Sequence, residues 1–305
     1  MYVPAQFHRD QLVANYHAWG RPKTSFLVGA EFERHLLRPG GNPVPYFGEH
    51  GVAWLLDRFA AEGWAPYHEG DNIIALYRGA SSITLEPGSQ FELSTAPYQT
   101  VGEVAKEALA FAEDVDRLAA GAPVHQAMLG FTPFATIPDI PWTPKGRYVV
   151  MREHLAQTGV LAHHMMKGTC ATQASFDFAD EADAAAKVRL GIALGPLTTA
   201  LFANSPIADG RPNGYASFRG HIWTRTDPVR TGFPDAAAEF SFERWVDWML
   251  DVPMMFVKHG GKWVPSGGRT FRQTPRPGRR ADRTITRPAF PGSSSGASTC
   301  GPEIL

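Results

Sequence analysis

Apolar and polar residues alternate along the stretch from Ser82 to Pro97, SITLEPGSQFELSTAP, as they do in two short strands. A Pro-Gly dipeptide separates the two runs and predicts a turn between them. Isoleucine, leucine and phenylalanine occupy one face, whereas Glu86, Gln90 and Glu92 occupy the other. We therefore predict a hairpin whose two carboxylates point away from the core.

The same alternation occurs earlier, in FLVGAEFERHLL, where Glu31, Glu33 and His35 share one face of a predicted strand. Four acids thus lie on two polar strand faces. Exposure of these faces to solvent is the simplest explanation of any single acid. Glutamate is depleted in strands, however, so its repetition is unusual.

Apolar residues recur at helical spacing over residues 6–19, 52–61, 100–119, 147–157, 182–203 and 242–255. Alternation predicts further strands at 64–67, 73–77 and 169–178, the last with Gln173 on its polar face. Small residues at Gly191, Ala193 and Gly195 are expected to allow close helix packing. Strands separated by long helices predict an α+β protein in which one face of an antiparallel sheet is left for a site.

Basic residues gather at two places in this order of elements. Lys145 and Arg147 stand at the start of a predicted helix, where they oppose the helix dipole and indicate either an anionic partner or a neighbouring acid. A loop over residues 208–215, too long for a mere connection and ending at Tyr215, precedes Arg219. Large apolar neighbours surround Arg219, so its charge needs a carboxylate or phosphate as partner. That partner is either an anionic ligand or an acid of the chain in a buried salt bridge.

Cys170 falls on an apolar strand face and is expected to be an inert core thiol.

Composition excludes several classes of protein. The chain has 305 residues, 44% of them hydrophobic, and its 29 basic and 30 acidic side chains nearly cancel. We therefore expect small-molecule substrates and neither a nucleic-acid nor a membrane partner. Two distant cysteines and the lack of a targeting or spanning segment lead us to expect a cytoplasmic location. Residues 274–305, rich in Pro, Arg, Gly and Ser, are predicted to be a disordered tail.

LEPGSQFELSTAP is very similar to the signature of the plant-type glutamate-cysteine ligases, and VGAEFER resembles the G-x-E-x-E strand of that family. Further blocks resemble the family in family order: EGDNIIAL, TPKGRYVVMREHL, MMKGTCATQASFDF, ALFANSPIADGRPNGYASFRGHIWTRTD and LDVPMMF. The resemblance covers about residues 5–273, so residues 1–273 are expected to form a catalytic domain. The tail matches nothing in the family, and we expect the domain to be truncated or frameshifted there.

This resemblance implies a fold and a reaction. The implied fold is an antiparallel sheet curled into a funnel with helices packed outside, as in glutamine-synthetase-like ligases, with its last part missing. The implied reaction uses ATP and Mg2+ to join the γ-carboxylate of glutamate to the amine of cysteine through a γ-glutamyl phosphate, the first step of glutathione biosynthesis. Glutamate, cysteine and ATP would then be the partners.

The resemblance also implies roles for individual residues. The candidate magnesium ligands are Glu31, Glu33, Glu86 and Glu92, with Glu69 and Asp71 as possible helpers. Glu33 and Arg219 are the catalytic candidates. The candidates for binding substrate or nucleotide are Arg219, Lys145, Arg147, Gln173 and Tyr215.

Two alternatives remain open at this point, and a third explains less. A related ligase of the same fold would use another amine acceptor, and a catalytically dead remnant would bind nucleotide or a longer relative. A carboxylate-pair hydrolase would also use Glu86 and Glu92, but it explains neither Arg219 nor the family blocks.

Overall fold

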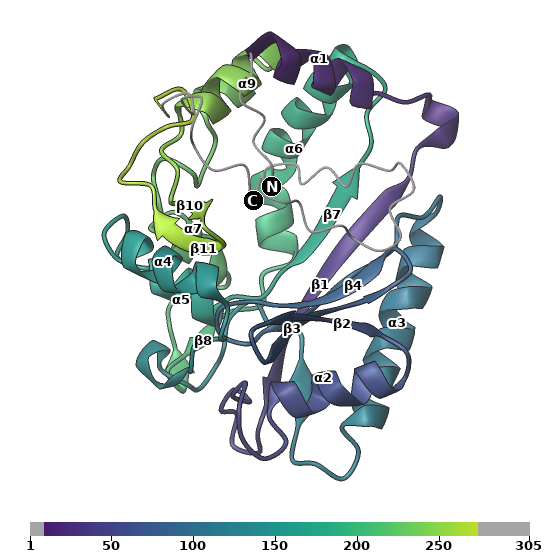
Figure 1. Ribbon diagram of the computed structural model, residues 1–305, viewed down its shortest axis with the longest axis vertical. Helices are drawn as coiled ribbons and strands as arrows, with labels where there is room; N and C mark the ends of the chain where they lie inside the picture. Colours follow the sequence, from purple (N-terminus) through teal and green to yellow (C-terminus); the bar gives the residue numbers. More distant parts are fainter. Residues whose placement is uncertain (1–8, 274–305) are drawn as a thin grey trace.

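A seven-stranded sheet organises residues 9–273, the part of the chain that this computed structural model describes (Figure 1). Its strands are β1 (Val28–Leu37), β2 (Ala65–Glu69), β3 (Asn72–Arg78), β4 (Ser81–Leu85), β5 (Phe91–Ser94), β6 (His125–Ala127) and β7 (Thr172–Phe176). The spatial order is β2-β3-β4-β5-β1, and both β6 and β7 pair with the other edge of β1. Every one of these pairings is antiparallel, as predicted.

The helices follow the predicted apolar periodicity closely. They are α1 (Arg9–Trp19), α2 (Val52–Ala61), α3 (Val101–Leu118), α4 (Gly146–Leu155), α5 (Ala162–Gly168), α6 (Glu181–Leu201), α7 (Phe218–Trp223), α8 (Asp235–Ala238) and α9 (Phe242–Asp251). Two 3-10 turns, Lys23–Ser25 and Ile137–Asp139, and two small hairpins, β8 (Ile207–Ala208) with β9 (Arg211–Pro212) and β10 (Phe256–His259) with β11 (Lys262–Pro265), complete the list. The short helices α5, α7 and α8, the strand β6 and both small hairpins were not predicted.

The main core lies between the sheet and the helices α2 and α3. Phe59 of α2 and Phe111 of α3 each contact Phe91 of β5, with ring centroids 5.8 Å apart in both pairs. Each buried phenylalanine contributes about 1.5–3 kcal/mol. The helix α3 begins with a capping box between Thr100 and Glu103. Because α2 and α3 cover this face, the polar residues that alternate with it along β4 and β5 lie on the opposite face.

A second group of elements gathers to one side of the sheet, at the left of Figure 1, and comprises α4, α5, α7 and the β10–β11 hairpin. The hairpin packs on α4. Small clusters of buried apolar residues hold this group together, one around Phe131 and Ile222 and another around Leu155 and Met166. These elements face the ends of the strands that carry the predicted acids.

The helix α6 differs from its prediction. Of the residues in α6, Ala184 and Ala185 are the ones that are buried, and the helix packs through Ala184 against α1 and α9. The expected close packing is wrong at Gly191 and Ala193, which are exposed, and a side chain added at Gly191 would meet nothing within 4 Å. Near Gly195 the ring of Phe233 lies within contact distance, so this part of the helix is covered only in places.

Two further observations concern the sequence-based expectations. No helix among residues 9–273 has both the length and the apolar character that crossing a membrane requires. The predicted disordered tail, residues 274–305, lies outside the described residues.

Candidate functional site

Two carboxylates face each other across the centre of the sheet. In the antiparallel register of β1 and β5, Glu33 is directly opposite Glu92. The Glu33 carboxylate accepts a hydrogen bond from the backbone N–H of Ala171, with an N···O distance of 2.6 Å. The buried Glu92 carboxylate accepts one from the hydroxyl of Thr84 on β4. These acids point away from the α2–α3 core, as the alternation predicts.

Glu86, at the end of β4, lies close enough to join this pair. Burial raises the pKa of Glu33 well above its ordinary value, and the charges of Glu86 and Glu92 raise that pKa further. The Ala171 hydrogen bond and the charge of Arg219 act in the opposite direction. We define Glu33, Glu86 and Glu92 as the acid cluster. Its members repel one another in a partly desolvated place, so the cluster favours a positively charged partner.

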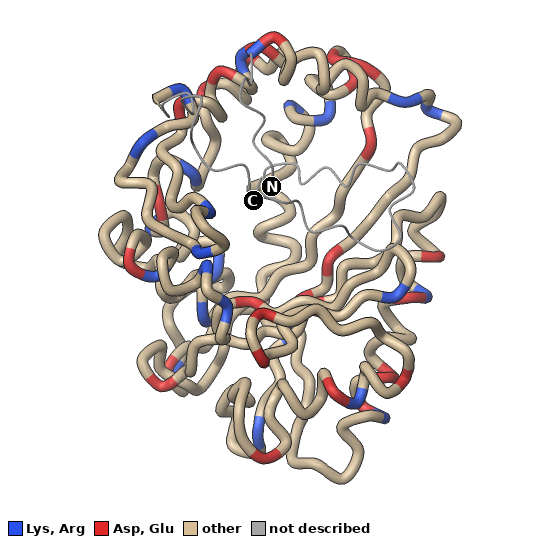
Figure 2. Tube along the Cα trace, viewed as in Figure 1, with Lys and Arg blue, Asp and Glu red and all other residues tan. Residues whose placement is uncertain are grey.

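Basic groups at the start of α4 face the acid cluster, and Figure 2 shows basic positions on the α4 side and acidic positions on the sheet side. Lys145 is only 7% exposed, and its ammonium group donates to the carbonyl of Leu85 at 2.7 Å. Burial, followed by the charge of Arg147, lowers the pKa of Lys145, whereas Glu86 and Glu92 oppose that change. The sequence left two explanations for these cations, an anionic partner or a neighbouring acid. The structure provides neighbouring acids, because the charges of Glu86 and Glu92 act on Lys145.

Glu69 has a structural contact at the same helix end. Its carboxylate accepts the backbone N–H of Gly146 at 3.1 Å, and its charge supports the protonated form of Lys145. Two cations at the start of a helix oppose the helix dipole, and the carboxylate of Glu69, which lies beside the first turn of α4, offsets this effect. Glu69 thus stabilises the helix that carries Lys145 and Arg147.

Arg219 reaches the acid cluster from α7. Its backbone N–H donates to the hydroxyl of Ser205 at 3.0 Å, and its guanidinium lies 5.7 Å from the ring centroid of Trp223. Its charge lowers the pKa of Glu33, so the two groups are close. The structure therefore brings together Arg219 and the predicted acids, although they are separated by more than a hundred residues in the chain.

The other candidates lie around this centre. Glu31 is opposite Gln173 in the β1–β7 pairing, and both are half-buried. Tyr215 is exposed just before α7, and its ring stacks on His221 with a centroid distance of 4.4 Å. Gln173 and Tyr215 thus come from the strand and the loop that border the acid cluster and Arg219.

Besides Glu92, two residues assigned to polar strand faces are buried. Gln90 is buried, and its amide donates to the carbonyls of Met166 and Thr169. His35 lies where β1 pairs with β6 and is 3% exposed, and burial lowers the pKa of His35 to about 4. Alternation identified the correct faces, but it does not show which neighbouring segment covers them.

The assignment of magnesium ligands stays a prediction. Within residues 9–273, no group of three or more His, Cys, Asp or Glu side chains is arranged so that it could hold a metal ion. Glu33, Glu86 and Glu92 do lie within electrostatic reach of one another. Cys170 lies buried beside them, and burial raises the pKa of its thiol, which agrees with its expected inertness.

Tyr148 belongs to the site but was not predicted. Its hydroxyl donates to the carbonyl of Leu85 at 2.7 Å and accepts from the guanidinium of Arg147 at 3.2 Å. It therefore holds Arg147 beside the end of β4. The sequence feature that could have identified Tyr148 is its position next to Arg147 in the block TPKGRYVVMREHL.

Comparison with known proteins shows extended similarity to plant enzymes. The chain is 42% identical over 276 residues to the chloroplastic glutamate–cysteine ligase of Brassica juncea, covering 87% of this chain and 52% of that protein. It is 41% identical over 276 residues to the chloroplastic enzyme of Arabidopsis thaliana, with 87% and 51% covered, and 39% identical over 275 residues to chloroplastic glutamate–cysteine ligase A of Oryza sativa subsp. japonica, with 87% and 54% covered. The chain thus spans about half the length of these relatives.

These relatives contradict one expectation. A cytoplasmic location was predicted for the chain, but the plant relatives that it matches are named as chloroplastic proteins. Composition and cysteine count describe a reducing compartment and cannot distinguish one such compartment from another.

The family assignment rests on a match that covers most of the chain. Residues 27–277 match the family described as glutamate-cysteine ligase family 2 (GCS2). The match includes β1, the β4–β5 hairpin, α4 and α7, which carry the acid cluster and the basic groups facing it. Together with identities of about 40% to three plant ligases, this match shows that the chain belongs to glutamate-cysteine ligase family 2.

Proposed function

We propose that this chain carries out ATP- and Mg2+-dependent ligation of the γ-carboxylate of glutamate to the amine of cysteine, through a γ-glutamyl phosphate. One observation carries this proposal: the carboxylates of Glu33 on β1, Glu92 on β5 and Glu86 just after β4 lie within electrostatic reach of three cations, Lys145, Arg147 and Arg219. A reaction that transfers a phosphoryl group to a carboxylate needs cationic groups to offset crowded negative charge. The plant relatives carry the name of this activity.

We also propose that the sheet belongs to the funnel of a glutamine-synthetase-like ligase fold. Its antiparallel pairing, with α2 and α3 on one face and the acid cluster on the other, supports this proposal. In such a funnel the uncovered face would form the inner wall. The acids of β1 and β5 would then line the mouth.

The acid cluster fits magnesium by the chemistry of its donors. Carboxylate oxygens are the hard ligands that Mg2+ prefers. Burial is the main cause of the raised pKa of Glu33, and repulsion from Glu86 and Glu92, which a cation would relieve, raises it further. Glu33, Glu86, Glu92 and Glu31 are the residues that would hold it. When bound, Mg2+ would neutralise negative charge on the nucleotide phosphates. Ala171 N–H and Thr84 hold two of the carboxylates in place beforehand.

The basic groups have separate roles in this proposal. Lys145 and Arg147, at the start of α4, would face the phosphates of ATP from the side opposite the acid cluster. Arg219 would hold a carboxylate of glutamate with two parallel hydrogen bonds and offset charge that develops in the reaction. Gln173 and Tyr215 border this place and would contact the amino-acid substrates.

The test is an assay of the chain with ATP, Mg2+, glutamate and a panel of amines that includes cysteine. We expect ADP formation that requires both glutamate and Mg2+ and is greatest with cysteine. A clear preference for another amine would identify a related ligase instead. Nucleotide hydrolysis that is indifferent to glutamate, or ATP binding that is indifferent to Mg2+, would contradict the proposal.

A further inference from the structure

The turn between β4 and β5, residues 86–90, is unusually enclosed for a hairpin turn. Hairpin turns commonly lie at the surface, but residues 87–90 of this turn are all buried. The turn carries Glu86 at its first position, and Glu86 is the member of the acid cluster that lies outside a strand. The backbone of this turn therefore decides where the Glu86 carboxylate lies.

Thr143 clamps this turn from the segment before α4. Its hydroxyl donates to the carbonyl of Glu86 at 2.6 Å and accepts from the backbone N–H of Ser89 at 3.0 Å. Its own backbone N–H donates to the carbonyl of Pro87 at 2.9 Å. Thr143 is 2% exposed, so water does not compete for these bonds. One side chain thus joins both ends of the turn.

The opposite side of the turn is held by the segment around α5. The Gln90 amide donates to the carbonyls of Met166 and Thr169 at 3.2 and 2.9 Å. A side chain at Gly88 would approach the carbonyl oxygen of Lys167 to 2.3 Å, so only glycine fits there. Ser89 has a φ of 65°, an uncommon conformation for a residue other than glycine. A backbone conformation of this kind persists when its surroundings determine it on several sides.

We propose that Thr143 is a positioning residue of the active site, which holds the backbone of Glu86 so that its carboxylate joins Glu33 and Glu92. This inference rests on the proposed magnesium-dependent function. Thr143 does not touch substrate or metal in this account. Groups that support metal ligands from behind typically change metal affinity by 10–100-fold when they are removed.

The test compares Thr143→Val, which keeps the shape but loses the hydroxyl, with Thr143→Ser, which keeps the hydroxyl. Thr226→Val is the matched control, because Thr226 is 1% exposed and its hydroxyl donates to the carbonyl of Ile222 at 2.9 Å. We expect Thr143→Val to raise the Mg2+ concentration for half-maximal ADP formation by about tenfold or more, with a much smaller change in the KM for glutamate. Thr143→Ser should restore most of the wild-type requirement, and Thr226→Val should leave it unchanged.

A second readout keeps the inference testable if the proposed function fails. The Ser89 N–H is shared between the Thr143 hydroxyl and the carbonyl of Glu86, at 3.0 and 2.9 Å. Without the hydroxyl the turn should open more often, so hydrogen exchange at the Ser89 amide should be faster in Thr143→Val than in wild type, Thr143→Ser or Thr226→Val. If the wild-type chain shows no Mg2+-dependent reaction, the proposed function fails, and amide exchange alone decides whether Thr143 holds the turn. Should Thr143→Val not fold, Thr143→Ala replaces it. An unchanged Mg2+ requirement, unchanged exchange at Ser89, or an equal rise in Thr226→Val would overturn the inference.

Discussion

At the scale of single residues, the site concentrates charge that is costly to bury. Glu33, Glu86 and Glu92 repel one another, and burial removes water that would screen them. Cationic side chains from α4 and α7 offset part of this cost. Such an arrangement lowers the stability of the folded chain in return for an electrostatic environment that can bind an ion or a phosphate.

The proposed clamp role of Arg219 gives the first prediction. We expect Arg219→Lys to weaken glutamate binding by at least tenfold while ATP binding changes much less, because lysine cannot make two parallel hydrogen bonds. Calorimetric titration of each substrate measures both affinities. Arg225→Lys, at an exposed position just after α7, is the control and should change neither. Equal losses of glutamate and ATP affinity would count against the clamp.

His35 gives a prediction about pH. Burial lowers the pKa of folded His35 to about 4, below the ordinary value of 6.5, so the unfolded chain binds more protons between these values. The free energy of unfolding should therefore fall as the pH falls from about 6.5 to about 4, by on the order of 3 kcal/mol from this residue. In His35→Gln this dependence should be weaker, and in His125→Gln, at an exposed position, it should persist. Chemical denaturation at several pH values measures the slope, and identical slopes in wild type and His35→Gln would contradict the assignment.

The residues show what a sequence can predict about a site. Alternation placed Glu33 and Glu92 on the correct face because the two-residue period of a strand is a local property. It did not predict that Gln90 and His35 are covered, because their neighbours come from α5 and β6, distant in the chain. The contact between Lys145 and the carbonyl of Leu85 also joins segments sixty residues apart.

At the scale of elements, long helices and paired strands were predictable and short elements were not. The helix α2 was predicted at its observed bounds, because its apolar residues recur at helical spacing and Gly63 follows its end. The helix α5 has seven residues and the β10–β11 hairpin has four residues in each strand, which is too short for a clear period. Their place is determined by packing against α4 and α7.

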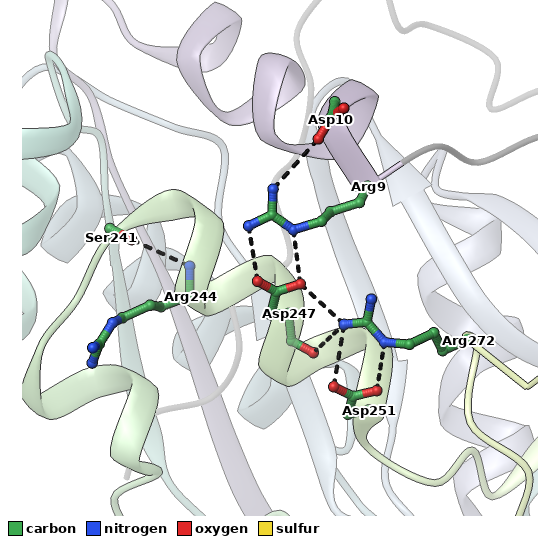
Figure 3. Close-up of polar contacts among 7 residues, drawn as sticks. All are labelled: Arg9, Asp10, Ser241, Arg244, Asp247, Asp251 and Arg272. Atoms are coloured by element: carbon green, nitrogen blue, oxygen red, sulfur yellow. Dashed lines mark hydrogen bonds and ion pairs between the residues drawn. The ribbon is translucent and has the colours of Figure 1, made fainter.

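The contact between α1 and the end of the described chain gives a prediction at this scale. Asp247 of α9 accepts hydrogen bonds from Arg9 of α1 at 2.8 Å and from Arg272 at 3.0 Å, as Figure 3 shows. These contacts hold the pKa of Asp247 near 2, with the Arg9 hydrogen bond as the main cause. All three side chains are partly exposed, so each pair contributes at most about 1 kcal/mol.

We expect Asp247→Asn to lower the melting temperature by a few degrees at low salt, and by less at high salt because ions screen exposed charges. Asp10→Asn is the control, since Asp10 is almost fully exposed and contacts Arg9 at 3.4 Å. Thermal unfolding at two salt concentrations measures both effects. A loss in Asp247→Asn that is no greater than the loss in Asp10→Asn would show that the network does not join α1 to α9.

At the scale of the whole molecule, the described residues leave an apolar surface on α6. Leu190, Leu194, Leu197 and Leu201 recur at helical spacing on this helix, and all four are exposed. The periodicity predicted a helix correctly but not its surroundings, because an apolar stripe shows only that a helix favours a partner. Exposed apolar surfaces of this kind favour association of protein molecules.

A substitution on this stripe should affect association but hardly affect stability. Leu197 is already 61% exposed, so Leu197→Gln should change the free energy of unfolding by less than about 0.5 kcal/mol. It should also reduce concentration-dependent association, which light scattering measures. Leu56→Gln, within the buried core of α2, should instead prevent stable folding. A large loss of stability in Leu197→Gln would show that α6 is covered.

The central claim is that the acid cluster binds the magnesium on which ATP-dependent ligation depends. The most direct measurement is the rate of ADP formation as a function of Mg2+ concentration in wild type and in Glu33→Gln, with Glu113→Gln of α3 as an exposed control. We expect Glu33→Gln to abolish Mg2+-dependent turnover while its melting temperature is unchanged or higher, because the substitution removes a buried repulsion. Glu113→Gln should behave as wild type. Near-normal turnover in Glu33→Gln at the same Mg2+ requirement would contradict the account.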